Sequence, residues 1–313
     1  MYTWHVAVDD QGKRLDLFVK ERAVTSSRQT IQFAIKRGEI RVNESVVAPH
    51  RFLKEGDSVV WGEPIPAAHE EASHHASARE LPELIVIKET PDWLVVDKPI
   101  GVLTHPNART TEPTLVDMLL AHAPGIAKIG EDPSRPGIVH RLDREVSGLM
   151  VVAKTQRAFD ELKRQFAQRE TEKTYLALVH GVVTEDEGDL RFSIARSTTA
   201  ARMAARPKND ATGKAAWTHY EVRERLLHAT LLELQILSGR THQIRAHLFA
   251  FQHPIMGDEL YKQRTQKSPV RPPRLMLQSI GLAFTDPLTG ERCSFMLPPD
   301  PAFTNLLQQI RDL

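Results

Sequence analysis

The sequence feature that most constrains this chain is a polar stretch that leads directly into an apolar one. Residues 140–148 read His-Arg-Leu-Asp-Arg-Glu-Val-Ser-Gly, and residues 149–153 are all apolar. A short continuous apolar run bounded by polar residues is typical of a strand that is buried on both faces. The sequence therefore predicts a loop that carries Asp143, flanked by Arg141 and Arg144, at the entrance to a buried strand.

The aspartate of this loop has two interpretations. A carboxylate is costly to bury alone, and neighbouring arginines favour its charged form. Because an ordinary aspartate has a pKa of roughly 4, it is ionised at neutral pH in either case. Asp143 is therefore either an anionic nucleophile or base among cations, or a loop residue that closes a turn and pairs with arginine. The residues of the loop alone leave both interpretations open.

Length and composition limit the class of protein. A chain of 313 residues suggests two domains, or one large domain with a small appendage. Its only cysteine, Cys293, excludes an internal disulfide. The first residues do not have the pattern of a signal peptide, and no run of about 18 apolar residues is present to span a membrane. We expect a cytoplasmic protein that acts as a monomer.

The charge is unevenly distributed although the net charge is only +1. Two segments, 190–209 and 260–285, contain no acidic residue, and each contains five basic ones. Basic segments in a nearly neutral chain suggest contact with phosphate groups, and solvated loops are the alternative. The basic residues are Arg191, Arg196, Arg202, Arg206 and Lys208 in the first segment, and Lys262, Arg264, Lys267, Arg271 and Arg274 in the second.

Composition and periodicity divide the chain into residues 1–62, 63–82 and 83–313. The middle segment is rich in proline, alanine and glutamate and has no apolar period, which is typical of a linker. It holds His69, His74 and His75, but a metal site needs further ligands at fixed spacing.

Residues 1–62 resemble an S4 domain, a small RNA-binding module. Helical patterns near 15–19 and 28–37, with Ser26 or Ser27 as a cap and Gly38 as the end, precede short strands at 40–43 and 58–61. Glu44 stands where the module often has glycine. The resemblance implies that Arg28, Lys36 and Arg37 contact RNA. The matching residues are Arg14-Leu15-Asp16, Ser27-Arg28, Ile35, Gly38, Val42-Asn43 and Gly56-Asp57.

Two motifs in residues 83–313 resemble the RluA-type pseudouridine synthases. The first is His-Arg-Leu-Asp at 140–143 followed by Ser-Gly-Leu at 147–149, with Val146 where the family usually has threonine. The second is Gly-Arg-Thr-His-Gln-Ile-Arg at 239–245, followed by His247. Thr241 is expected to cap a helix in this segment. His242 and His247 are five residues apart and lack the spacing of a zinc helix.

The family resemblance implies roles for individual residues. Asp143 is the nucleophile or base, Arg245 pairs with it, and Tyr175 packs on the target uracil and takes a proton. Arg141 fills the space that a flipped base leaves. Further RNA contacts are expected from His140, Arg144, Arg240, Thr241 and His242.

The resemblance and the patterns together predict an α+β fold. Strands and helices alternate without a regular βαβ repeat, which favours a mixed, mainly antiparallel sheet in the catalytic domain. The N-terminal unit is expected to be a small α/β, αL-like domain. Neither a phosphate-binding loop nor a dinucleotide fingerprint is present, so we expect neither a cofactor nor a metal.

Three functions remain to be compared. The first is isomerisation of uridine in RNA, with large-subunit ribosomal RNA favoured over transfer RNA because S4-bearing members of the family commonly act there. The second is a non-catalytic RNA-binding assembly factor, which the joint presence of Asp143, Tyr175 and Arg245 disfavours. The third is a nucleoside or glycoside hydrolase that uses Glu145 as a second carboxylate.

Overall fold

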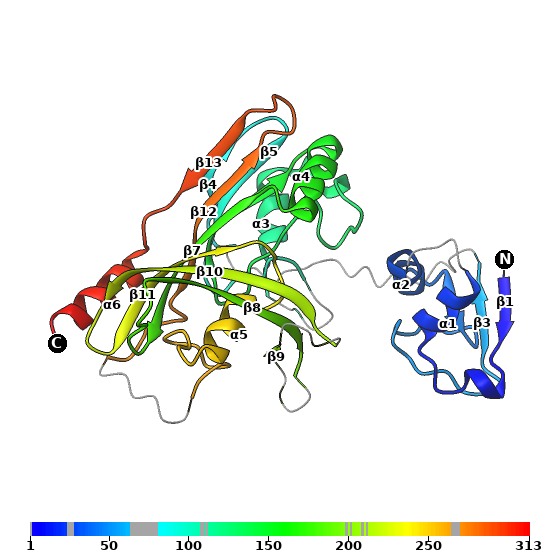
Figure 1. Ribbon diagram of the computed structural model, residues 1–313. Coiled ribbons are helices and arrows are strands. Elements are labelled where there is room, and N and C mark those ends of the chain that lie inside the picture. Colours follow the sequence, from blue (N-terminus) through cyan, green and yellow to red (C-terminus); the bar gives the residue numbers. More distant parts are fainter. Residues whose placement is uncertain are drawn as a thin grey trace. The chain divides into compact units, whose positions relative to one another are not determined.

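The computed structural model describes residues 2–23, 28–62, 81–106, 110, 112–197, 200, 202–207, 210, 212–263 and 270–313, without the side chains of residues 28–30 and 36. The chain divides into two compact units, residues 1–75 and 76–313. Most of the predicted linker, including its three histidines, lies outside the described residues. We describe each unit by itself (Figure 1).

The N-terminal unit is a three-stranded antiparallel sheet packed on two helices. Its strand order is β1-β3-β2. The apolar faces of the helices and strands form a core of their own, which includes Phe18, Ile35 and Val59. The elements are β1 (Tyr2–His5), η1 (Val8–Asp10), α1 (Leu15–Arg22), α2 (Arg28–Lys36), β2 (Ile40–Val42) and β3 (Ser58–Trp61).

The turn after β2 accommodates Glu44, which stands where an S4 domain often has glycine. Asn43 and Glu44 both have positive φ angles, of 50° and 65°. The Asn43 side chain donates to Asp57 at 2.7 Å and accepts from the backbone N–H of Ser58 at 2.8 Å. These two hydrogen bonds hold the turn although no glycine is present at position 44. The expected serine cap of α2 lies outside the described residues.

The larger unit is organised around a sheet that has ten strands among the described residues, in the order β4-β5-β6-β12-β7-β11-β10-β8-β9, with β13 beside β12. All neighbouring pairs are antiparallel except β6 and β12. The predicted mixed, mainly antiparallel sheet is therefore confirmed. The strands are β4 (Ile85–Glu89), β5 (Trp93–Lys98), β6 (Ser147–Ala153), β7 (Glu172–His180), β8 (Glu187–Arg196), β9 (Met203–Arg206), β10 (Lys214–Arg225), β11 (Ala229–Ile236), β12 (Leu277–Thr285) and β13 (Arg292–Met296).

Helices cover both faces of the strands that lead from the polar loop. Alternate residues of a strand point to opposite faces, so β5 and β6 contribute to two cores. One face packs with α3 (Leu115–His122) and α6 (Pro301–Arg311), and the other packs with α4 (Gln156–Gln168). Every residue of β6 is buried, which agrees with the prediction from its continuous apolar run.

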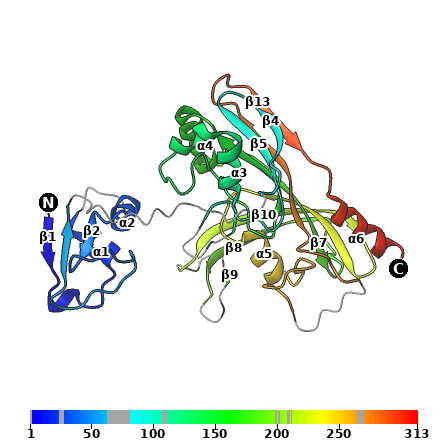
Figure 2. The same cartoon turned by 180° about the vertical axis from the view of Figure 1, so that it is seen from behind.

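The remaining elements lie around the site. Helix α5 (Gln243–Ala250) packs against β8, β9 and β10, at the opposite end of the sheet from α4 (Figures 1 and 2). A solvated loop was the alternative interpretation of the first basic segment. Its residues 190–196 and 203–206 belong instead to the paired strands β8 and β9. The expected loop from 125 to 136 begins instead with the 3-10 helix η2 (Pro124–Lys128).

Gly148 is required where β6 approaches β12. Its φ angle is +121°, and a Cβ atom there would lie 2.1 Å from the carbonyl oxygen of Ser279. The parallel pairing of the two strands occurs at this point, through Ser147 and Gly148. The glycine of the polar motif thus permits a backbone contact that any side chain would prevent.

We therefore expect Gly148→Ala to destabilise the larger unit by more than about 3 kcal/mol, since it combines a backbone clash with an unfavourable φ angle. Urea unfolding followed by circular dichroism measures the loss. Gly125→Ala is the matched control, because a Cβ atom at Gly125 would meet no heavy atom within 4 Å and the residue has no positive φ angle. Equal stability of the two variants would contradict this explanation.

Candidate active site

Hydrogen bonds to backbone carbonyl groups fix the loop that carries Asp143. The Thr104 hydroxyl donates to the Leu142 carbonyl oxygen at 2.9 Å. The Lys98 ammonium is fully buried and donates to the carbonyl oxygens of Pro99 and Val102 at 2.9 and 2.8 Å. Burial lowers the pKa of Lys98 to about 8, against the opposing charge of Asp143. The lysine also donates to the Arg144 carbonyl oxygen at 3.5 Å, and through this bond it contacts the loop itself.

Arg245 lies between two aspartates. Its Nε and Nη2 donate to the two carboxylate oxygens of Asp258 at 2.7 and 2.9 Å. Its Nη1 lies 3.5 Å from Asp143 Oδ2 and 3.4 Å from Glu145 Oε2. The Asp258 side chain is fully buried, whereas that of Asp143 is 16% exposed. Asp258 thus orients the guanidinium, whose remaining nitrogen faces the Asp143 carboxylate.

Tyr175 forms part of the wall beside Asp143. It lies on β7, only 6% of its surface is exposed, and its hydroxyl forms a hydrogen bond with Ser279. Burial, and secondarily the charge of Asp143, raises the pKa of Tyr175 well above its ordinary value. The phenol is therefore neutral at physiological pH.

Helix α5 begins differently from the prediction. Its residue before the first turn is His242, with a φ angle of 53°, and not the expected Thr241. The left-handed conformation of His242 prevents Thr241 from occupying the cap position. The start of the helix is held by the Gln243 side chain, whose Oε1 accepts hydrogen bonds from Ser238 Oγ and from the Arg240 backbone N–H.

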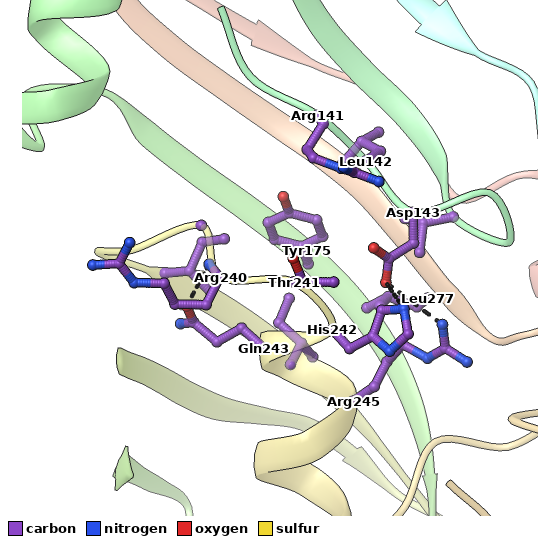
Figure 3. A pocket seen from close by; sticks show the side chains of 14 residues that line it. Arg141, Leu142, Asp143, Tyr175, Arg240, Thr241, His242, Gln243, Arg245 and Leu277 are labelled. Carbon is purple, nitrogen blue, oxygen red and sulfur yellow. Dashed lines mark hydrogen bonds and ion pairs between the residues drawn. The ribbon is translucent and has the colours of Figure 1, made fainter. Parts of the chain in front are cut away.

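These residues line an open pocket whose empty space, together with the solvent at its mouth, is about 490 Å³. In Figure 3 the Asp143 carboxylate points toward His242 and Arg245, and the Tyr175 ring lies beside them. His242 Nε2 is 3.9 Å from Asp143 Oδ2, and burial lowers the pKa of His242. The pocket therefore brings a carboxylate and an arginine together with an aromatic ring that could cover a planar base. Its lining residues are Arg141, Leu142, Asp143, Val146, Tyr175, Ile236, Gly239, Arg240, Thr241, His242, Gln243, Ile244, Arg245 and Leu277.

The expected RNA-contact residues fall into two groups. Arg141, Arg240 and Thr241 are exposed and line the pocket, although Arg240 points away from Asp143 in Figure 3. The Arg144 guanidinium instead donates to the Gly101 carbonyl oxygen and pairs with Glu112. Arg144 therefore supports the loop in this structure.

His140 differs from the cation that a phosphate contact would need. Its Nε2 accepts the backbone N–H of Val151 at 3.0 Å, and burial lowers the pKa of the ring to about 3. In the N-terminal unit, Arg37 pairs with Glu39 at 2.8 Å, and the side chains of Arg28 and Lys36 lie outside the described residues.

Sequence reasoning did not assign a role to Asp258 or Ser279. Asp258 lies in a segment, Pro254 to Asp258, that also suits the family pattern, so the motif itself held a usable signal. Ser279 lies inside a buried strand, where nothing distinguishes a serine that bonds to Tyr175 from one that only packs.

The described cations of the second basic segment differ in their surroundings, and Arg271 is exposed. Arg274 is largely buried and pairs with Asp300, and Lys262 pairs with Glu259. The described residues contain no helix long and apolar enough to cross a bilayer. Within that same part of the chain, His, Cys, Asp and Glu side chains form no group of three or more suited to holding a metal ion.

Comparison with known proteins identifies the family. Residues 92–250 match the model of a family described as RNA pseudouridylate synthase. An uncharacterized RNA pseudouridine synthase of Aquifex aeolicus is 36% identical, over 97% of this chain and 96% of the relative. The chain belongs to the RNA pseudouridylate synthase family. It is an RNA pseudouridine synthase, and the predicted RluA-type resemblance is confirmed.

Two further relatives carry a more specific name. The ribosomal large subunit pseudouridine synthase D of Nitrosomonas europaea is 35% identical, over 96% of this synthase and 86% of the relative. The protein of the same name in Pseudomonas aeruginosa is 34% identical, over 96% and 92%. Among solved structures, human RNA pseudouridylate synthase domain containing 1 matches with a TM-score of 0.56 and 26% identity, over 74% of this synthase and 96% of that chain. The S4 assignment of the N-terminal unit stays a prediction.

Proposed function

We propose that this synthase isomerises uridines of large-subunit ribosomal RNA and that Asp143 is its catalytic residue. The contact between Asp143 and Arg245, 3.5 Å apart in a pocket walled by Tyr175, supports the catalytic assignment most strongly. The relatives named ribosomal large subunit pseudouridine synthase D, which align over nearly the whole chain, support the choice of RNA.

The reaction breaks one bond and forms another without an external energy source. The base–sugar carbon–nitrogen bond of uridine is cleaved, the uracil turns, and its C5 forms a carbon–carbon bond to the same sugar carbon. The C5 proton leaves, and the nitrogen gains one. Whether Asp143 attacks the sugar or adds to the base, its ionised oxygen supplies the electron pair, as carboxylates do in glycoside cleavage. Arg245 favours that ionised form.

The neutral phenol of Tyr175 limits when it can accept a proton. The charge of Asp143 is one cause of its raised pKa. Once Asp143 is joined covalently to the substrate, that charge is gone and the tyrosine pKa falls. The neutral phenol must first give its own proton to the uracil nitrogen that bond cleavage frees, and only then can Tyr175 accept the proton that leaves C5.

RNA must present its uridine out of a helix for this chemistry. Arg141, exposed and without an ion pair in the described part of the chain, is proposed to fill the vacated position. The N-terminal unit is proposed to bind RNA as an S4 domain, through Arg28, Lys36 and Arg37. Arg240, Thr241 and His242 would contact the target strand at the pocket. The proposed setting is the cytoplasm, with the synthase acting as a monomer.

The direct test is to incubate the protein with an unmodified large-subunit ribosomal RNA transcript. We expect pseudouridine at one or a few uridines, measured by chemical mapping and mass spectrometry, and no free uracil. Release of uracil would indicate the hydrolase that uses Glu145. Tight RNA binding without either product would indicate an assembly factor.

A further inference from the structure

A second hollow adjoins the catalytic pocket and has no role in the mechanism above. It is open to solvent, its empty space together with the solvent at its mouth is about 1,040 Å³, and it shares Arg141, Tyr175, Ile236 and Gly239 with the catalytic pocket. The two spaces are therefore separated by no more than shared side chains. A nucleotide joined to the target uridine by one phosphodiester bond would lie within reach of it.

The charged residues that line the second hollow are all cationic. Four cationic residues line it, and none of its lining residues is an aspartate or a glutamate. Two of them are neutralised in part at the rim, because Arg135 pairs with Asp132 and Lys163 with Glu131. The others are Arg141, which is exposed, and Lys173, which is not.

Lys173 is the unusual member of this set. It is 9% exposed, and within the described residues no carboxylate lies at ion-pair distance from its ammonium. Its aromatic neighbour is the ring of Phe166, whose centroid is 5.5 Å from Nζ. Burial lowers its pKa to about 8, so it remains mostly charged at neutral pH. A charged side chain with so little exposed surface costs stability, and a phosphate in the hollow would offset that cost.

An aromatic surface accompanies the cation. Phe166 packs on the apolar side of α4, but it is only partly buried and lines the hollow. Its ring stacks on His140 at 4.4 Å, which fixes its orientation. A buried ammonium for a phosphate beside an aromatic ring for a base is the pair of groups that single-stranded nucleotides require.

We infer that the second hollow binds the nucleotide next to the target uridine in the same RNA strand, with its phosphate at Lys173 and its base against Phe166. This inference rests on the proposed RNA substrate. The hollow then holds the same RNA strand that enters the catalytic pocket. Arg141, which lines both spaces, would contact both nucleotides.

The first test is RNA binding by Lys173→Met, which keeps the apolar stem and removes the charge. We expect the Kd for an unmodified large-subunit ribosomal RNA transcript to rise about tenfold, and the salt dependence of binding to fall by about one phosphate contact. In turnover, KM should rise while kcat stays within about twofold. Lys88→Met is the matched control, because Lys88 is exposed on the edge strand β4.

Thermal stability separates this role from a structural one. A lysine that only supports the fold would lower the Tm when it is removed. We expect Lys173→Met to raise the Tm at pH 7, because it deletes an unpaired buried charge. The folded pKa of about 8 lies below the ordinary 10.5, so the gain is full below pH 8 and disappears as the pH rises toward 10.5.

Phe166→Leu is the second variant and does not depend on the behaviour of Lys173. It should raise the Kd for RNA by severalfold without changing the salt dependence, because stacking on the base is lost while the phosphate contacts remain. Wild-type affinity for RNA in both variants would overturn the inference. So would an effect of Lys173→Met on binding of uridine monophosphate or inorganic phosphate with none on RNA, since that would indicate a site for a free anion.

The binding assay needs no turnover, so the two proposals fail separately. If RNA binding depends on Lys173 and Phe166 but no pseudouridine forms, the subsite stands and the proposed function fails. If pseudouridine forms and neither variant affects the Kd or the KM, the subsite fails alone.

Discussion

Asp143→Asn is expected to lower pseudouridine formation by about 10⁴-fold or more, the range seen when a nucleophile is removed. An amide has nearly the shape of the carboxylate but lacks its charge and its nucleophilic oxygen. The fold should persist, because Arg245 keeps its two hydrogen bonds to Asp258. Single-turnover formation of pseudouridine measures the loss, and filter binding should give a Kd for RNA within about threefold of wild type.

Glu145→Gln is the matched control for this prediction. Its carboxylate lies 3.4 Å from the same nitrogen of Arg245, but its side chain is 53% exposed. A solvated carboxylate contributes little to the charge state of its neighbours, so activity should stay within a few-fold of wild type. Substantial turnover by Asp143→Asn would remove Asp143 from the mechanism. Equal loss in both variants would instead favour chemistry that needs two carboxylates.

Contiguous motifs made part of the fold and of the candidate site predictable. Asp143, Tyr175 and Arg245 were proposed from the resemblance of their motifs to the family, and the structure places all three around one pocket. The buried strand β6 followed from an uninterrupted apolar run, and all of its residues are buried. In each case local pattern and tertiary structure depend on the same residues.

The parts that could not be predicted depend on segments that are distant in the chain. Arg144 was expected to contact RNA, but it bonds to Gly101 and Glu112, which lie more than thirty positions away. The second hollow is formed by residues near 135–141, 163–173 and 236–239, and no single segment indicates it. Thr241 failed as a cap because His242 adopts a left-handed conformation that a histidine seldom has.

The ion pair between Arg245 and Asp258 should carry a large share of the stability of the catalytic unit. Arg245→Met leaves a fully buried carboxylate whose other hydrogen bonds, among the described residues, come from the backbone N–H groups of Leu260 and Tyr261. Removing one partner of a buried pair typically costs about 3–5 kcal/mol, because the other charge stays buried without compensation. We expect a loss of that size in the free energy of unfolding, with activity lost as well.

Urea unfolding measures this loss if the signal comes from the catalytic unit alone. Replacing Trp4 and Trp61 by Phe leaves Trp93 and Trp217 as reporters in that unit. Arg311→Met is the control, since Arg311 pairs with Glu224 at the surface and its removal should change stability far less.

The double variant Arg245→Met/Asp258→Leu tests why Arg245→Met loses stability. The loss comes either from the missing attraction between the two charges or from the Asp258 charge that stays buried without a partner. If an unpaired buried charge is the cause, the double variant should be more stable than Arg245→Met, because no charge is left to bury. It should still be inactive, because Asp143 has lost the guanidinium that lies 3.5 Å from its carboxylate. A double variant that loses the sum of the two single losses would show that each side chain contributes through packing. Asp258 would then be no more than a space-filling residue, and the orientation of Arg245 toward Asp143 would need another cause.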